Sequence, residues 1–315
     1  MGIIAACAFP GQGAQRPGMG KDFFDEFAVS RQTYEEAADA LGWDVAALCF
    51  GDDERLNLTE FTQPCLLTTE IAILRGLNLR YDLAPVIFGG HSLGEFTALV
   101  AAGSLPLAAT IKTVHIRGRL MQQAVPVGLG GMAAVISKNL DPAILHQKLA
   151  DLPMDVANAN SAHQMVISGH LQALPEAEHR LRESFKHDQD FRFVPLKVSA
   201  PFHSRFMKPI EAAFADTLHE QKDSLAAEQG AMVTSNYTGQ FHAASPDAII
   251  ANLVAQLSNT VRWTDNMRCL AEKADIIYEI GPSRPLREFF KTVAAAKCVS
   301  ITSLATAERA FRENN

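Results

Sequence analysis

The sequence is poor in the features that mark secreted, metal-binding, membrane and nucleic-acid-binding proteins. Its 315 residues include only five cysteines, none in a C-x-x-C pair, which argues against a disulfide framework and against a zinc site. No apolar run approaches the roughly 20 residues of a membrane span. The formal net charge is −7, whereas binding to nucleic acid demands a basic face. We therefore expect a cytoplasmic protein with no membrane or nucleic-acid partner.

Signals for targeting and for cofactors are also missing. The apolar N-terminus has no cationic start and is too short for a signal peptide. Ala6 stands where a myristoylation motif needs Ser or Thr. The segment GQGAQR (11–16) starts like a dinucleotide loop but lacks the third glycine, and neither a P-loop nor H-E-x-x-H occurs. We expect no bound cofactor and no metal.

Short β-type runs alternate with longer helical patterns, which predicts an α/β fold with a largely parallel sheet. Between 128 and 197 the predicted order changes to β-α-β-β-α-β, the order of the ferredoxin-like unit. We therefore expect a small inserted subdomain at 128–197 and a large domain made of 1–127 and 198–315. Strands of the large domain are predicted at 3–9, 85–90, 231–236 and 275–281.

The segment GHSLG around Ser92 fits G-x-S-x-G, the nucleophile elbow. An apolar strand precedes it and a helix-forming segment follows, so Ser92 is expected at a strand-to-helix turn. There its hydroxyl is lifted from the sheet, and the free N–H groups of the helix N-terminus face any oxyanion above it. The pattern favours a nucleophile over a chance glycine-rich turn.

A serine nucleophile needs a base, and His203 is the best of the ten histidines. It follows an apolar strand and a Pro201 turn, which places it at a strand end, where active sites gather in parallel sheets. His91 adjoins the serine in sequence, but on the turn it should point away from the hydroxyl. A core histidine is the alternative reading of His203.

Arg117 lies on the apolar face of a predicted helix at 107–124. Thr110, Val114 and Met121 share its face by steps of three and four residues, and the polar side chains occupy another face. An unpaired guanidinium on a buried face is costly. It must therefore meet an anion, either an internal Asp or Glu or an anionic group of a substrate.

Six segments in order resemble the malonyl-CoA:acyl carrier protein transacylases and the related acyltransferase domains of polyketide synthases. They are FPGQGAQ, GHSLGEF, RGRLMQ, NANS, SAPFHS and QLSNTVRW, spread over roughly residues 5 to 305. The resemblance implies an α/β-hydrolase-like core with a ferredoxin-like insertion. It also implies a malonyl group moved from malonyl-CoA to the phosphopantetheine thiol of acyl carrier protein, through an ester on Ser92.

The resemblance also implies the roles of further residues. His203 would be base and then acid, and the backbone N–H groups of Gln12 and Leu93 would form the oxyanion hole. Arg117 would bind the malonyl carboxylate, and Phe202 would fill the space that an α-methyl group needs. Asn160 and Gln256 belong to the expected substrate-binding set, and the backbone carbonyl of Gln256 would orient His203 in place of an acid.

Other functions remain open at this point. A thioesterase or acyl hydrolase that clears carrier proteins could use the same scaffold, and a non-catalytic carrier-docking module is the rival from another class. The sequence leaves the pathway, fatty-acid or polyketide synthesis, undecided. We expect a monomer whose partners are malonyl-CoA and an acidic carrier protein, with Arg205, Lys208, Arg284, Arg287 and Lys291 as candidate docking residues.

Overall fold

The large domain is built around four parallel strands in the order β2-β1-β7-β8. The inner strand β1 is apolar throughout, and its side chains alternate between two cores: Cys7 and Phe9 face one, Ala6 and Ala8 the other. Burial on both faces is typical of parallel sheets. The computed structural model describes residues 3–198, 200–293 and 296–312. The strands are β1 (Ala5–Phe9), β2 (Ile87–Gly90), β7 (Ile276–Ile280) and β8 (Cys298–Ile301).

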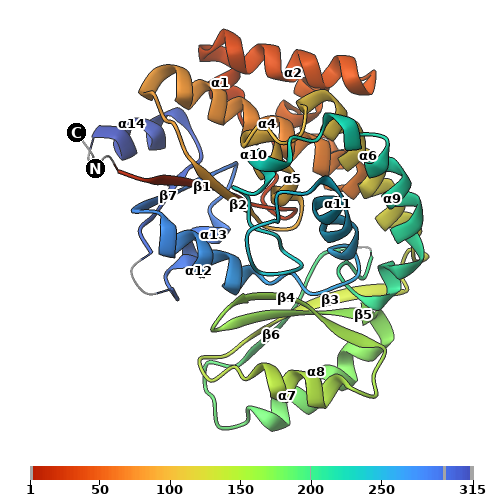
Figure 1. Cartoon of the computed structure of the whole chain (residues 1–315). Helices are drawn as coiled ribbons and strands as arrows, with labels where there is room; N and C mark the ends of the chain where they lie inside the picture. Colours follow the sequence, from red (N-terminus) through yellow and green to blue (C-terminus); the bar gives the residue numbers. More distant parts are fainter. Residues whose placement is uncertain (1–2, 199, 294–295, 313–315) are drawn as a thin grey trace.

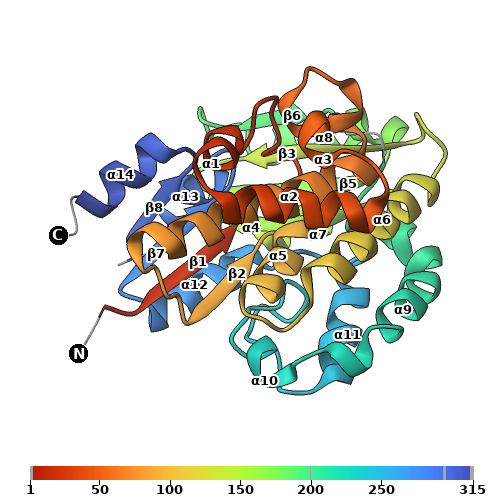
Figure 2. The same ribbon diagram turned by 90° about the horizontal axis from the view of Figure 1, so that it is seen from above.

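Helices cover both faces of this sheet. α4 and α5 pack on one face, and α12 and α13 on the other (Figure 1). Figure 2 shows α14 and α9 at opposite ends of the molecule. The helices of this domain are α1 (Lys21–Glu26), α2 (Ala28–Leu41), α3 (Val45–Phe50), α4 (Thr59–Tyr81), α5 (Leu93–Ala101), α6 (Leu107–Gln123), α9 (Glu211–His219), α10 (Ala227–Gly230), α11 (Pro246–Ala255), α12 (Trp263–Lys273), α13 (Pro285–Phe290) and α14 (Leu304–Arg312).

A second, antiparallel sheet has the strand order β4-β5-β3-β6. Its elements follow the predicted order β-α-β-β-α-β, and α7 and α8 cover the face turned away from the large domain (Figure 1). The hydrophobic core beneath these helices is separate from the two cores of the large domain. The elements are β3 (Gly130–Ile136), α7 (Pro142–Leu149), β4 (Met154–Ser161), β5 (Gln164–His170), α8 (Leu174–Ser184) and β6 (Arg192–Pro195).

The α/β class is confirmed, but two details of the large sheet differ from the prediction. The segment 231–236 is not a strand: Val233 forms one isolated bridge to Phe88, and Thr234 then pairs with Phe241 instead. The ladder stops after Thr234 because the backbone N–H of Ser235 donates to the carbonyl of Gln240 and that of Asn236 donates to Glu95. Strand β8 was missed, since it is short and only partly buried.

Within the described residues, no helix combines the length and the apolar character that a membrane crossing requires.

Helices α4 and α6 approach closely at Gly118. A Cβ atom there would lie 2.6 Å from the Cα of Glu60 and from the carbonyl oxygen of Thr59, both backbone atoms of α4. The absence of a side chain at Gly118 therefore sets how near α6 lies to α4.

We predict that Gly118→Ala pushes α6 away from α4 and lowers the free energy of unfolding by about 1–3 kcal/mol, as overpacking does. Urea unfolding measures the loss. Lys112→Ala, on the exposed face of the same helix, is the control and should change stability by less than about 0.5 kcal/mol. Equal stability of the two variants would contradict the close approach.

Candidate active site

Ser92 occupies the turn between β2 and α5 with backbone angles of φ 52° and ψ −103°. This left-handed conformation is strained for a residue with a side chain and is typical of a nucleophile elbow. Two glycines make the turn possible: a Cβ at Gly90 would overlap the backbone of Gly94, and a Cβ at Gly94 would overlap the carbonyl of Phe9. The predicted strand-to-helix turn is therefore present.

His203 contacts the hydroxyl of Ser92. The Oγ of Ser92 lies 2.7 Å from Nε2 of His203, and Nδ1 of His203 lies 2.8 Å from the backbone carbonyl oxygen of Gln256. A carbonyl oxygen only accepts, so Nδ1 carries the proton and Nε2 is the free acceptor. The hydroxyl thus donates to Nε2, which is the arrangement that general-base activation of a serine needs.

The surroundings keep His203 neutral. Burial, and then the positive charge of Arg117, lower the pKa of His203 to about 3, while the hydrogen bond to Gln256 acts in the opposite direction. An ordinary histidine has a pKa of about 6.5. The ring is therefore an unprotonated base throughout the neutral range.

Arg117 is buried, with 1% of its surface exposed, and it faces the nucleophile. Its Nη2 donates to the Oγ of Ser92 at 3.2 Å and to Oε1 of Gln256 at 2.7 Å, and its Nη1 donates to Oε1 of Gln63 at 2.8 Å. The ring of Phe96 lies under the guanidinium, 5.3 Å away. These oxygen partners are all uncharged.

The guanidinium consequently has unused capacity for an anion. Among the described residues, no carboxylate forms an ion pair with Arg117, and its buried Nε has no hydrogen-bond partner. Burial lowers the pKa of Arg117 to about 10, and the nearby charge of Glu95 opposes this shift. The internal-acid alternative for Arg117 is therefore not realised by direct contact.

A small cavity of about 110 Å³ joins these groups. Ser92, His203 and Arg117 line it, together with Phe202 and Leu93. Gln12 completes one wall, and its side-chain Oε1 accepts a hydrogen bond from Thr59 at 2.6 Å. As the first residue of α5, Leu93 has a backbone N–H without a partner inside the helix, which suits an oxyanion.

Asn160 lies outside this small cavity. It lines an adjoining cleft of about 950 Å³ that runs between the large domain and the antiparallel sheet and that also includes Gln12 and His91. The Oδ1 of Asn160 lies 2.8 Å from Nε2 of His91. His91 thus bonds to Asn160, whereas the Ser92 hydroxyl bonds to His203, and the ring of His91 contacts Trp263.

The Gln256 side chain faces protein groups rather than the cavity. Its Oε1 accepts from Arg117, and its Nε2 donates to the backbone carbonyl of Ser92 at 3.0 Å and to Oε2 of Glu95 at 2.6 Å. Sequence reasoning missed Glu95 and Gln63 as parts of the site. Both are polar side chains within apolar helical segments, and this pattern could have indicated a buried role.

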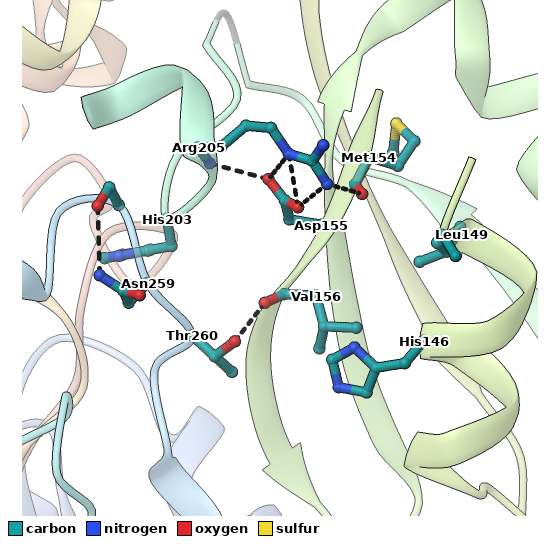
Figure 3. A pocket seen from close by; sticks show the side chains of 11 residues that line it. His146, Leu149, Met154, Asp155, Val156, His203, Arg205, Asn259 and Thr260 are labelled. Atoms are coloured by element: carbon teal, nitrogen blue, oxygen red, sulfur yellow. Dashed lines mark hydrogen bonds and ion pairs between the residues drawn. The ribbon is translucent and has the colours of Figure 1, made fainter. Parts of the chain in front are cut away.

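The loop that carries His203 is held by the antiparallel sheet. Arg205 donates its backbone N–H to Oδ2 of Asp155 at 2.8 Å, and its guanidinium pairs with the same carboxylate. Thr260 donates to the carbonyl of Val156 at 2.6 Å. Figure 3 shows these contacts around a cavity of about 330 Å³ that His203 also lines. Strand β4 therefore anchors both the His203 loop and the segment after Gln256.

His203 lies beside Ser92, as predicted, but it does not stand at the end of a strand of the parallel sheet. The strand before it, β6, belongs to the antiparallel sheet and not to the parallel one. His203 lies in a later turn, just before a 3-10 helix at Arg205–Ile210, with a positive φ of 56°. Tertiary contacts, rather than a strand end, bring it to the serine.

The described residues include no group of three or more His, Cys, Asp or Glu side chains that could hold a metal ion.

The model of the acyl transferase domain family matches residues 8–303. The chain belongs to this family. Among curated relatives, it is 36% identical over 294 residues to the malonyl CoA-acyl carrier protein transacylase of Escherichia coli K12, covering 91% of this chain and 92% of that protein. It is 35% identical over 316 residues to the transacylase of Bacillus subtilis 168, covering 98% and 96%.

Solved structures of this family have the same fold. The transacylase from Xanthomonas oryzae superimposes with a TM-score of 0.91 at 33% identity, over 99% of this chain and 98% of that one. A malonyl-transacylase in complex with its type II polyketide synthase acyl carrier protein gives a TM-score of 0.89 at 35% identity, over 99% and 100% of the two chains.

For this member of the acyl transferase family, the lowered pKa of His203 predicts an unusual pH profile. A histidine with a pKa of about 3 remains unprotonated as the pH falls from 8 to about 5. The rate of acylation by acetyl-CoA should therefore stay constant over this range. Acetyl-CoA is used because it has no titrating carboxylate. Arg117→Ala removes a neighbouring cation, so the acid limb should move to higher pH. A wild-type limb near pH 6.5, or no movement in the variant, would argue against this environment.

Proposed function

We propose that this protein transfers a malonyl group from malonyl-CoA to the phosphopantetheine thiol of an acyl carrier protein, through an ester on Ser92. One observation carries the proposal: a buried guanidinium with only uncharged hydrogen-bond partners lies 3.2 Å from an activated serine. A simple acyl chain has no group for such a cation, whereas the free carboxylate of a malonyl thioester does. Family membership and relatives named as malonyl transacylases agree with it.

In the first half-reaction, the Oγ of Ser92 attacks the thioester carbonyl while Nε2 of His203 takes the hydroxyl proton. The oxyanion that forms would accept hydrogen bonds from the N–H groups of Leu93 and Gln12. Collapse of the tetrahedral intermediate breaks the carbon–sulfur bond. The CoA sulfur leaves with the proton from His203, and malonate remains as an ester on Ser92.

The second half-reaction reverses these steps with a different thiol. His203 takes the proton of the phosphopantetheine thiol, whose sulfur attacks the ester carbonyl. The carbon–oxygen bond to Ser92 breaks, and His203 returns the proton to Oγ. Because CoA leaves before the carrier reacts, the kinetics should be ping-pong.

Phe202 suits the acyl group of the substrate, and the wide cleft suits its pantetheine arm. Phe202 lines the small cavity and fills space beside Ser92, so it is proposed to disfavour an α-methyl group, a discrimination of about 1–3 kcal/mol. The cleft of about 950 Å³ is lined by amide side chains such as Asn158, Asn160 and Gln164. We assign it to the pantetheine arm, which has two amides of its own.

The charges around the site modify the expectation for carrier docking. Arg205 pairs with Asp155, Lys208 with Glu211, and Lys291 with Glu288. These three cations are therefore partly neutralised by neighbours. Arg284 and Arg287, at the start of α13 beside the cleft, are the better proposed contacts for an acidic carrier.

We infer an α/β-hydrolase-like core formed by 1–127 and 198–315 and a ferredoxin-like subdomain at 128–197, supported by the separate core of the antiparallel sheet. We propose that the protein works in the cytoplasm as a monomer, without a cofactor other than the CoA thioester that is its substrate.

A quenched reaction with labelled malonyl-CoA tests the function. We predict that the label is found on Ser92 and moves to carrier protein when the holo carrier is added. Ser92→Ala should take up no label. Movement of the label into free malonate would favour a hydrolase instead, and absence of labelling in the wild type would favour a carrier-docking module.

We predict that Arg117→Ala lowers kcat/KM for malonyl-CoA by at least about 100-fold, because a buried ion pair with the substrate is lost. Transfer of acetyl should be retained or improved, since acetyl has no carboxylate. Arg119→Ala, on the exposed face of the same helix, is the control and should leave both rates unchanged. Equal losses for the two acyl groups in Arg117→Ala would contradict the role of Arg117.

A further inference from the structure

Glu95 is a fully buried carboxylate one turn after Ser92, and it does not touch the reacting atoms. Its Oε1 lies 2.9 Å from Nε2 of His242. Its Oε2 accepts from the backbone N–H of Asn236 at 3.0 Å and from Nε2 of Gln256 at 2.6 Å. A buried carboxylate is tolerated only with such partners. Three N–H donors from three separate segments thus converge on Glu95.

The tautomer of His242 follows from its second contact. Nδ2 of Asn252 lies 3.2 Å from Nδ1 of His242, and an amide NH₂ group only donates. Nδ1 is therefore the acceptor, and Nε2 carries the proton that points at Glu95. An ionised carboxylate only accepts hydrogen bonds, so all partners of Glu95 must be donors.

This requirement sets the orientation of the Gln256 carboxamide. Since a carboxylate cannot donate, the Nε2 end of the amide must face Glu95 and the Oε1 end must face Arg117, 2.7 Å from its Nη2. With the amide reversed, NH₂ would face the guanidinium, donor against donor. Glu95, together with the backbone carbonyl of Ser92, therefore holds the amide so that Arg117 meets an acceptor.

The same carboxylate supports the strained backbone of Ser92. The backbone N–H of Ser92 donates to Oδ1 of Asn236 at 2.6 Å, and its carbonyl accepts from Nε2 of Gln256 at 3.0 Å. Both carboxamide residues are bonded to Glu95 as well. The nucleophile and Arg117 are thus held by one buried anion at the centre of the polar network.

We propose that Glu95, held by His242, is a positioning residue for selection of the malonyl group. It fixes the Gln256 carboxamide, which in turn fixes the guanidinium of Arg117 opposite Ser92. This inference rests on the proposed function and adds a determinant of its specificity. The negative charge of Glu95 also helps Arg117 to remain charged in a buried site, since it opposes the effect of burial on the pKa of Arg117.

The test replaces Glu95 by Gln, which keeps the size and removes the charge. In Glu95→Gln, an NH₂ group faces either His242 or the Asn236 and Gln256 donors, and the anion that holds the Gln256 amide is lost. We expect kcat/KM for malonyl-CoA to fall at least about tenfold more than kcat/KM for acetyl-CoA, the effect of losing a hydrogen bond to a charged group. A ratio of the two values within twofold of wild type overturns the proposal, because a purely structural role would lower both alike.

Glu70→Gln is the matched control. Glu70 is also fully buried and bonds to Thr97 of α5, but within the described part of the chain it forms no hydrogen bond to the Ser92 network, and burial raises its pKa well above the ordinary value. Gln resembles its uncharged form, so this variant should keep the malonyl-to-acetyl ratio of the wild type. A change as large as that of Glu95→Gln would overturn the specific role of Glu95.

A second pair of variants leaves Glu95 in place, in case Glu95→Gln does not fold. His242→Leu removes one donor to the carboxylate and should lower the malonyl-to-acetyl ratio by about threefold or more, whereas His242→Gln supplies an N–H again and should restore it. Equal ratios in the two variants overturn the proposal. Labelling of Ser92 in the wild type is measured in parallel: if it fails, the proposed function fails, independently of Glu95.

Discussion

The account depends on one interaction, the contact of a buried guanidinium with the hydroxyl that is to be acylated. Arg117 has lost nearly all contact with solvent and meets only uncharged oxygen atoms from Gln63, Gln256 and Ser92. Such a cation is costly in the empty site and becomes favourable when an anion enters. We propose that the site thereby selects an acyl group that brings its own negative charge.

The same cation acts on the base. Its charge, together with burial, keeps His203 neutral, so Nε2 is free to accept the serine proton, although the protonated ring holds that proton only weakly. A carbonyl oxygen, that of Gln256, orients the ring in the place where many hydrolases use a carboxylate. A carboxylate there would lie near Arg117 and compete with the substrate for it. The carboxylate of Glu95 is also buried, but the side-chain amide of Gln256 lies between it and the guanidinium.

Local patterns predicted much of the site. Ser92 was found from glycine spacing between a strand and a helix, and Arg117 from helical periodicity, since both signals depend on only a few neighbouring residues. His203 was found as well, although the strand before it belongs to the other sheet. The segment 231–236 was wrongly predicted as a strand, because after Thr234 its backbone N–H groups bond to Gln240 and Glu95 and not to β2.

The remaining partners could not be predicted from such patterns. Gln63, Asn236 and His242 come from segments distant in sequence and meet only around Glu95 and Arg117. Each is a polar residue in a segment without a recognisable motif. Its role in the site depends on a hydrogen bond that only the tertiary fold creates. The short strand β8 escaped detection for a similar reason, since its place is set by pairing with β7.

The most direct test of the central claim is a crystal structure of the enzyme trapped as the malonyl ester of Ser92. The account predicts that the free carboxylate of the ester lies within hydrogen-bond distance of the Arg117 guanidinium and engages its Nε. A carboxylate that points into the wide cleft, with Arg117 still bonded only to Gln63 and Gln256, would contradict it.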